Sequence, residues 1–265
     1  MRLILKDVYG QPGKVVVTAH RGFSGKYPEN TLAAFRAAEA LGADILEFDL
    51  RGTKDGVPIV LHDRTFERTA NQPGKPGDYT LSEIRGFTAS YWEGAHDTGV
   101  RRAEPTASDV RIPTFEDVLN GVGEGVGLNI QVYDTTPPVL AEIARLYRAH
   151  DLYDRAYLTM ATYRDGERVR SLDARIALCV NESHGRMNEQ ALREQQAFGC
   201  RYVQPYTNDV SPEFCRRAKA LGLCVNLFCS NTDDDNRRYI AMGVPGILTD
   251  WPDILQNTLR SLGRL

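Results

Sequence analysis

The amino-acid sequence predicts an α/β protein of the (β/α)8, or TIM-barrel, class. Three observations predict it: short β-rich runs alternate with amphipathic helical patterns, eight such runs are each followed by a helical pattern, and the 265 residues suit one barrel domain. Alternation of strand and helix favours a parallel sheet, and eight units in this length favour its closure. We therefore expect residues 1–265 to form a single domain.

The β-rich runs are four to eight residues long, as is usual for strands. The expected strands are Val15–Ala19, Ile45–Arg51, Val126–Tyr133, Ala156–Met160, Arg175–Val180, Arg201–Pro205, Cys224–Phe228 and Gly246–Thr249. The expected helices are Thr31–Leu41, Thr114–Leu119, Pro138–His150, Arg164–Ser171, Asn188–Phe198, Pro212–Leu221, Thr232–Met242 and Pro252–Leu262.

One further strand-like run, Pro58–Leu61, has no helix before it. The link from Arg51 reads Gly-Thr-Lys-Asp-Gly, and Asp-Gly is a strong signal for a tight turn. We expect residues 45–61 to form a hairpin that extends the second barrel strand and doubles back.

Residues 63–113 then interrupt the alternation with turn-forming residues and only a short helix near Leu81–Arg85. Insertions after a barrel strand lie over the active-site mouth. We therefore expect a small cap here that is part of the barrel domain.

Composition excludes some classes of function. Thirty-two Lys and Arg against 35 Asp and Glu give a net charge of −3, so a nucleic-acid substrate is not expected. No apolar run reaches the roughly 18 residues of a membrane helix, and the N-terminus lacks a signal-peptide pattern, so we expect a cytoplasmic protein without membrane insertion. The five cysteines include no CxxC pair and are expected to be structural. Nothing in the sequence specifies an oligomeric state.

Four ionisable residues are expected to meet at the mouth of the barrel. His20 ends the first strand, and Glu47 and Asp49 stand two apart on the second, so both carboxylates point inward from the same face. The hairpin returns His62 to the same level. A buried pair of carboxylates is costly unless a hard cation such as Mg²⁺ or Ca²⁺ binds it.

Each of these residues also has an ordinary structural explanation. A histidine at a strand end is often a satisfied polar residue, and a Glu-x-Asp pair is often a solvated strand face. Asn30 is expected simply to cap the helix that begins at Thr31. The coincidence of two imidazoles and two carboxylates at one end of one barrel favours a catalytic site.

Two imidazoles beside a divalent cation suit cleavage of a phosphate ester. The cation neutralises charge on the phosphoryl oxygens. Near neutral pH one histidine takes a proton from the nucleophile while the other gives one to the leaving alkoxide. Arg21, beside His20, is a candidate donor to a phosphate oxygen.

The motifs AHRG, YPENT, AAF, GADILEFDL, TKDG and PIVLHD, with GVPGILTDWPD near the C-terminus, resemble the glycerophosphodiester phosphodiesterase family. The resemblance implies a TIM-type barrel, a divalent metal (Mg²⁺ or Ca²⁺), and hydrolysis of glycerophosphodiesters to glycerol 3-phosphate and an alcohol. By the same resemblance His20 and His62 are the acid–base pair, and Glu47 and Asp49 are metal ligands.

One strand departs from the family pattern. Where the family resembled here has Asn-Ile-Glu-Ile-Lys, with Glu as a third metal ligand, this chain has Asn-Ile-Gln-Val-Tyr at residues 129–133. Alternation keeps Gln131 and Tyr133 facing inward. An amide oxygen still ligates Mg²⁺ or Ca²⁺, so we expect Gln131 to remain a ligand and Tyr133 to contact the substrate.

Three explanations of this change compete. The enzyme acts on an unusual phosphodiester; or another carboxylate, from Asp134 or Glu182, takes the third position; or catalysis is lost and a phosphoester-binding protein remains. We favour a substituted enzyme because both histidines and the first two ligands are retained. A lyase that forms a cyclic phosphate from a lysolipid or sugar phosphodiester is the alternative enzyme.

Two further residues flank this site in the sequence. Trp251 follows the last strand and is expected to contact the substrate, with burial under the barrel rim as the alternative. His96 lies in the insertion and is expected to be a solvated loop residue, with substrate contact as the alternative.

Overall fold

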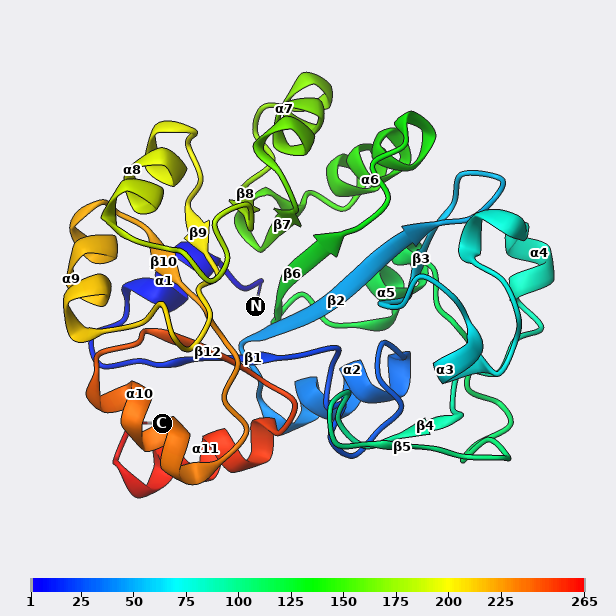
Figure 1. The fold of residues 1–265 in the computed structure, drawn as a ribbon, viewed down its shortest axis with the longest axis horizontal. Helices are drawn as coiled ribbons and strands as arrows, with labels where there is room; N and C mark the ends of the chain where they lie inside the picture. Colours follow the sequence, from blue (N-terminus) through cyan, green and yellow to red (C-terminus); the bar gives the residue numbers. More distant parts are fainter. Residues whose placement is uncertain (1, 265) are drawn as a thin grey trace.

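The computed structural model describes residues 2–264 and confirms the (β/α)8 barrel (Figure 1). The strands are β1 (Val16–Ala19), β2 (Ile45–Gly52), β3 (Pro58–Val60), β4 (Trp92–Glu93), β5 (Val100–Arg101), β6 (Gly127–Val132), β7 (Ala156–Met160), β8 (Leu178–Val180), β9 (Tyr202–Val203), β10 (Cys224–Val225), β11 (Leu227–Phe228) and β12 (Gly246–Thr249). The helices are α1 (Leu5–Gly10), α2 (Leu32–Leu41), α3 (Glu67–Ala70), α4 (Leu81–Ile84), α5 (Phe115–Gly121), α6 (Pro137–Ala149), α7 (Tyr163–Leu172), α8 (Glu189–Ala197), α9 (Pro212–Ala220), α10 (Asp233–Ala241) and α11 (Pro252–Ser261), with 3-10 turns η1 (Pro76–Asp78) and η2 (Leu152–Asp154).

The barrel strands follow one another in chain order. The main sheet runs β11-β12-β1-β2-β6-β7-β8 with parallel neighbours, and β9 pairs in parallel with β10. The backbone N–H of Arg201, just before β9, donates to the carbonyl of Leu178 in β8 at 3.3 Å. The segment predicted as one strand over Cys224–Phe228 changes partner halfway, because β10 pairs with β9 and β11 pairs with β12. Together these contacts close the ring of strands.

Strand alternation separates an apolar layer outside the barrel from an interior whose polarity rises from the N-terminal to the C-terminal end of the strands. Phe48 of β2 points outward and packs between Phe35 and Phe115, with ring centroids 5.6 and 6.0 Å away. At the N-terminal end of the barrel the interior is apolar, with Tyr157 and Tyr202 stacked at 4.1 Å. Above them lies a layer of hydrogen-bonded amide and hydroxyl side chains, formed by Thr18, Asn129, Thr159, Gln204 and Asn226. The ionisable residues occupy the opposite, C-terminal end.

The sequence did not predict α1. Its apolar patch is short, but Leu5 is fully buried against the apolar residues at the N-terminal end of the barrel. Tertiary packing therefore stabilises a six-residue helix that local propensity alone would not.

The predicted hairpin is confirmed, because β3 pairs antiparallel with β2 and places Val60 opposite Leu50. The insertion that follows contains α3, η1, α4, β4 and β5, and in Figure 1 it lies on the β2–β3 side of the barrel. Its Phe66 and Ile84 pack against Ile59 of the hairpin, in an apolar cluster separate from the main core. The hairpin thus anchors the insertion.

Two global expectations also have structural counterparts. None of the helices within residues 2–264 combines the length and apolar character that crossing a bilayer requires. All five cysteines carry free thiols, and burial raises the pKa of Cys200 and Cys229 to about 12, so these two thiols stay protonated.

Candidate active site

A cavity of about 150 Å³ lies at the C-terminal end of the barrel strands. Its lining residues come from almost every barrel strand or from the loop after it: His20, Arg21, Asp49, His62, Gln131, Tyr133, His184, Gln204, Tyr206 and Phe228. Six of the eight predicted site residues are in this set. Glu47 lies next to it, with its Oε2 3.9 Å from Nε2 of His20.

His20 is held in one orientation by Asp250. Its Nδ1 donates to Oδ1 of Asp250 at 2.6 Å, and its ring meets Phe228 edge-on at 5.3 Å. Both side chains are buried, His20 being 5% exposed and Asp250 6% exposed. Because Nδ1 is committed to the carboxylate, Nε2 is the nitrogen that faces the cavity.

Asp250 was not predicted from the sequence. It accepts further hydrogen bonds from Ser24 Oγ (2.9 Å) and Asn231 Nδ2 (2.7 Å). These hydrogen bonds and the charge of His20 hold the pKa of Asp250 well below its usual range, although burial alone would raise it. Alternation along the last strand carried the signal, since residues 246, 248 and 250 share the inner face.

His62 is fixed in the same way from the other side of the cavity. Its Nδ1 donates to Asp63 Oδ1 at 2.8 Å, and its backbone carbonyl accepts from Nε of Arg51 at 2.9 Å. The His62 ring meets the ring of Tyr133 edge-on at 5.5 Å. The insertion contributes His96, whose ring centroid is 5.2 Å from that of His62. His96 was expected to be a solvated loop residue, but it packs against His62 at the edge of the candidate site.

The two strand carboxylates are fully enclosed. Glu47 and Asp49 are each 1% exposed. Glu47 accepts a hydrogen bond from the backbone N–H of Arg21 at 3.0 Å. Burial, and then the negative charge of Asp49, raise the pKa of Glu47 well above its usual value. Because burial and mutual repulsion make it costly for both groups to be ionised, a cation bound between them would be strongly favoured.

Asn30 was expected to cap the following helix, and this expectation is wrong. Thr31 is the capping residue, with its Oγ1 accepting from the backbone N–H of Ala34 at 3.3 Å. Asn30 is 5% exposed, and its Nδ2 donates to Oδ2 of Asp49 at 2.8 Å. Its left-handed backbone (φ +58°) aims the amide at the carboxylate rather than along the helix.

Arg21 belongs to a buried ion cluster as well as to the cavity wall. Its NH1 donates to Glu29 at 2.9 Å, and its Nε lies 3.4 Å from Asp49. Glu29 also binds Arg68 through two hydrogen bonds of 2.7 Å, and Arg68 in turn binds Asp63 at 2.6 and 2.9 Å. The cluster therefore runs without a break from Asp49 to the carboxylate that orients the second histidine.

Gln131 and Tyr133 occupy the inward positions predicted for them. Gln131 lies directly opposite Asp49 in the pairing of β6 with β2, and its Nε2 donates to the Tyr133 hydroxyl at 2.8 Å. The amide oxygen is thereby left for another partner. Burial, and then the charges of Asp49 and Glu47, raise the pKa of Tyr133, so this residue is a neutral phenol.

Neither of the two candidate replacement carboxylates reaches the site. Asp134 accepts from the backbone N–H of Thr136 at 2.9 Å and lines a different cavity. Glu182 accepts from the backbone N–H of Tyr163 at the start of α7. The idea that one of them replaces the family's third carboxylate is therefore wrong for this structure.

Trp251 is not among the residues that line the 150 Å³ cavity. Its ring lies over Gly25, where an added Cβ would come within 2.6 Å of it, and it packs against the main core. Gln204, Tyr206 and Phe228 also line the cavity, although none of them was predicted as a site residue, because none carries a charge.

The donor set fits a hard divalent cation. Glu47, Asp49 and Gln131 offer only oxygen atoms, and two of them are carboxylates withdrawn from water. Mg²⁺ and Ca²⁺ prefer such ligands, whereas softer ions prefer nitrogen or sulfur.

Comparison with known proteins identifies the family. The model of the "Glycerophosphoryl diester phosphodiesterase family" matches residues 20–254. This chain belongs to that family. It is therefore a phosphoric diester hydrolase. The matched range includes every residue of the site described above.

Two bacterial relatives are similar over most of their length. A glycerophosphodiester phosphodiesterase of Caldanaerobacter subterraneus subsp. tengcongensis is 30% identical over 256 residues, which cover 94% of this chain and 100% of the relative. One from Bacillus subtilis (strain 168) is 27% identical over 254 residues, covering 92% of this chain and 86% of the relative.

Solved structures share the fold. A chain from Silicibacter pomeroyi superimposes with a TM-score of 0.83 at 24% identity, covering 98% of this chain and 99% of that one. An Oleispira antarctica phosphodiesterase, solved in complex with the product sn-glycerol-3-phosphate, has a TM-score of 0.77 at 22% identity and covers 92% of this chain and 96% of its own. Both likenesses support the barrel.

Proposed function

We propose that the protein hydrolyses a small glycerophosphodiester, or a closely related phosphodiester, to a phosphomonoester and an alcohol. The observation that carries the proposal is the convergence of two imidazoles, each fixed through Nδ1 by a carboxylate, on one buried cluster of oxygen donors. The substrate class is supported by the relatives named above and by the product bound in the Oleispira antarctica structure.

His20 and His62 are the proposed acid–base pair. In hydrolysis a water oxygen bonds to phosphorus, and the bond from phosphorus to the alcohol oxygen breaks. One imidazole takes the proton of the water at Nε2, and the other gives a proton to the departing oxygen. Asp250 and Asp63 hold the two rings so that Nε2 of each is the nitrogen left to do this.

Glu47, Asp49 and Gln131 are the residues proposed to hold Mg²⁺ or Ca²⁺. Such a cation, when bound, neutralises negative charge on the phosphoryl oxygens. Because Gln131 contributes a dipole and no charge, we expect weaker metal binding than a third carboxylate would give. Arg21 and Tyr133 are proposed to contact the substrate, the first as a cation and the second as a neutral hydroxyl. For Trp251, which packs against the core, substrate contact stays a prediction.

The test is cleavage of a glycerophosphodiester panel followed by ³¹P NMR, with Mg²⁺, Ca²⁺ or EDTA. Turnover is expected only with metal, and His20→Ala and His62→Ala are each expected to lower kcat about 10²- to 10⁴-fold. His150→Ala, at the end of α6, is the matched control and is expected to keep wild-type activity. Gln131→Glu is expected to bind the metal more tightly.

Other results would point elsewhere. A cyclic phosphate product, or no incorporation of ¹⁸O from water in a single step, would replace the hydrolase with a lyase. A silent wild type that gains turnover in Gln131→Glu would indicate a phosphoester-binding protein. Residual turnover that survives His20→Ala would refute the role given to that residue.

A further inference from the structure

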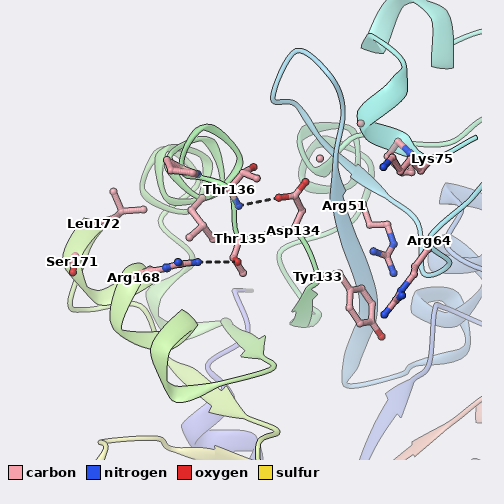
Figure 2. Close-up of a pocket in the computed structure, with 15 residues that line it drawn as sticks. Arg51, Arg64, Lys75, Tyr133, Asp134, Thr135, Thr136, Arg168, Ser171 and Leu172 are labelled. Atoms are coloured by element: carbon pink, nitrogen blue, oxygen red, sulfur yellow. Dashed lines mark hydrogen bonds between the residues drawn. The ribbon is translucent and has the colours of Figure 1, made fainter.

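A second and much larger cavity, of about 960 Å³, adjoins the active site. It is bordered by the β2–β3 hairpin, the insertion, the start of α6 and the end of α7, and it is open to solvent (Figure 2). We call it the side cavity. Tyr133 lines both the side cavity and the 150 Å³ catalytic cavity. The volume of the side cavity is at the upper end of the roughly 300–1,000 Å³ found for small-molecule sites.

Positive charge dominates the lining of the side cavity. Its basic residues are Arg51, Arg64, Lys75 and Arg168. The one carboxylate in the lining belongs to Asp134, which already accepts the backbone N–H of Thr136. Within residues 2–264, Arg168 alone of the four basic side chains forms an ion pair, with Asp165 at 3.3 Å. The cavity therefore carries a surplus of unpaired positive charge.

Two of these cations lie close together. Figure 2 shows Arg51 and Arg64 side by side next to Tyr133, with Arg168 on the opposite wall. Burial is the main cause that lowers the pKa of Arg51, against the opposing charges of Tyr133, Asp49 and Asp63, and the charge of Arg64 lowers it further. The Arg51 guanidinium stacks on the Tyr133 ring at 4.5 Å. Like charges held together repel each other, and a bound anion would relieve this repulsion.

The side cavity is also connected to the chemistry. Arg51 donates to the carbonyl of His62, and the His62 ring contacts the ring of Tyr133. The ring of Tyr133 is therefore the wall between the two cavities, and a group attached to a phosphorus atom at the histidines would enter the side cavity past this ring. Apolar side chains, including Leu140 and Leu172, line its far end and suit a carbon framework.

We propose that the side cavity binds a second phosphate carried by the alcohol half of the substrate. On this proposal, which rests on the proposed function, the preferred substrates are glycerophosphodiesters whose leaving alcohol is itself a phosphate monoester. Choline and ethanolamine are cations, so their glycerophosphodiesters meet repulsion in the same place. The cationic lining thus selects among substrates that the catalytic residues treat alike.

The test compares substrates that differ by one phosphate. Metal-dependent kcat/KM is measured for glycerophosphoinositol 4-phosphate, glycerophosphoinositol and glycerophosphocholine. The phosphorylated substrate is expected to be favoured about tenfold over its unphosphorylated counterpart, and the preference is expected to shrink as ionic strength rises.

Variants of the lining locate the effect. Arg64→Ala and Lys75→Ala are each expected to reduce the preference for the phosphorylated substrate about three- to fivefold. Arg216→Ala and Lys219→Ala, which remove exposed cations from α9, are matched controls and are expected to leave the preference unchanged.

Three outcomes separate the possibilities. Equal kcat/KM for glycerophosphoinositol and its 4-phosphate, with metal-dependent turnover intact, would overturn this inference and leave the proposed function standing. No turnover of any substrate would overturn the proposed function itself. If inorganic phosphate changes the turnover of glycerophosphoinositol in the wild type but not in Arg64→Ala, the cavity binds a separate anion, and the assignment to the substrate is wrong.

Discussion

Replacing Glu29 with glutamine tests whether the buried ion cluster behind the active site stabilises the fold. Glu29 is 5% exposed and binds both Arg21 and Arg68. The opposing charge of Arg21, with hydrogen bonds and charge from Arg68, lowers its pKa from 4.5 to about 2 against the opposing effect of burial. Glutamine keeps the shape of the side chain and removes the charge.

The expected loss follows from the size of that shift. About 2.5 pKa units at about 1.36 kcal/mol each give roughly 3 kcal/mol of unfolding free energy near pH 7. Because the pKa is lower in the folded state, this stability is complete above about pH 4.5 and is lost as the pH falls towards 2. The difference in unfolding free energy between wild type and Glu29→Gln is therefore expected to decrease by about 2 kcal/mol between pH 7 and pH 3.

Urea unfolding monitored by tryptophan fluorescence measures this gap, with EDTA present so that bound metal does not contribute. Glu213→Gln is the matched control, because Glu213 forms an exposed pair with Arg217 and its loss is expected to cost less than about 0.5 kcal/mol. A gap that stays constant from pH 7 to pH 3 would refute the reasoning. So would a loss at pH 7 below about 1 kcal/mol.

Three other changes have defined outcomes. Asp250→Asn is expected to lower kcat about 10²- to 10³-fold with little change in KM, because the imidazole of His20, the proposed acid or base, keeps its place but loses its charged partner. Steady-state kinetics across pH would measure this effect, and an unchanged kcat would contradict it. Asn30→Ala is expected to weaken Mg²⁺ or Ca²⁺ binding severalfold by freeing Asp49 to move, as isothermal titration calorimetry would detect. Gly22→Ala is expected to destabilise the protein by roughly 2–4 kcal/mol, because φ is +78° and the new methyl would lie 2.6 Å from the carbonyl carbon of Ala34; wild-type stability in urea would exclude this clash.

Most of the site followed from strand alternation. Glu47 and Asp49 share a face because they are two apart on one strand, and His20 ends the neighbouring strand, so their convergence needed only the correct strands and the barrel. The hairpin return of His62 was equally local, because an Asp-Gly turn marks it. The predicted boundaries of most strands agree with the structure to within a few residues.

The parts that escaped prediction depend on contacts between distant segments. Asp250 orients His20 from 230 positions along the chain. Asn30 stands beside a helix start, where a capping role is the usual local choice, yet its backbone conformation directs it to Asp49 instead. The approach of His96 to His62 requires the path of the whole insertion. No local pattern contains this information.

The ion cluster that runs from Asp49 through Arg21, Glu29 and Arg68 to Asp63 would couple the proposed metal binding to the insertion. A divalent cation bound at Asp49 would replace part of the electrostatic stabilisation that Arg21 gives this carboxylate. The ion pair between Arg21 and Glu29 would then become stronger, and Glu29 also binds Arg68 of α3. Because coupling between two sites is reciprocal, a substitution that strengthens or weakens the Glu29–Arg68 ion pair is also expected to change the affinity for the metal. Substitutions within the insertion, with no contact to the metal, are therefore expected to alter the metal concentration at which the enzyme is half active.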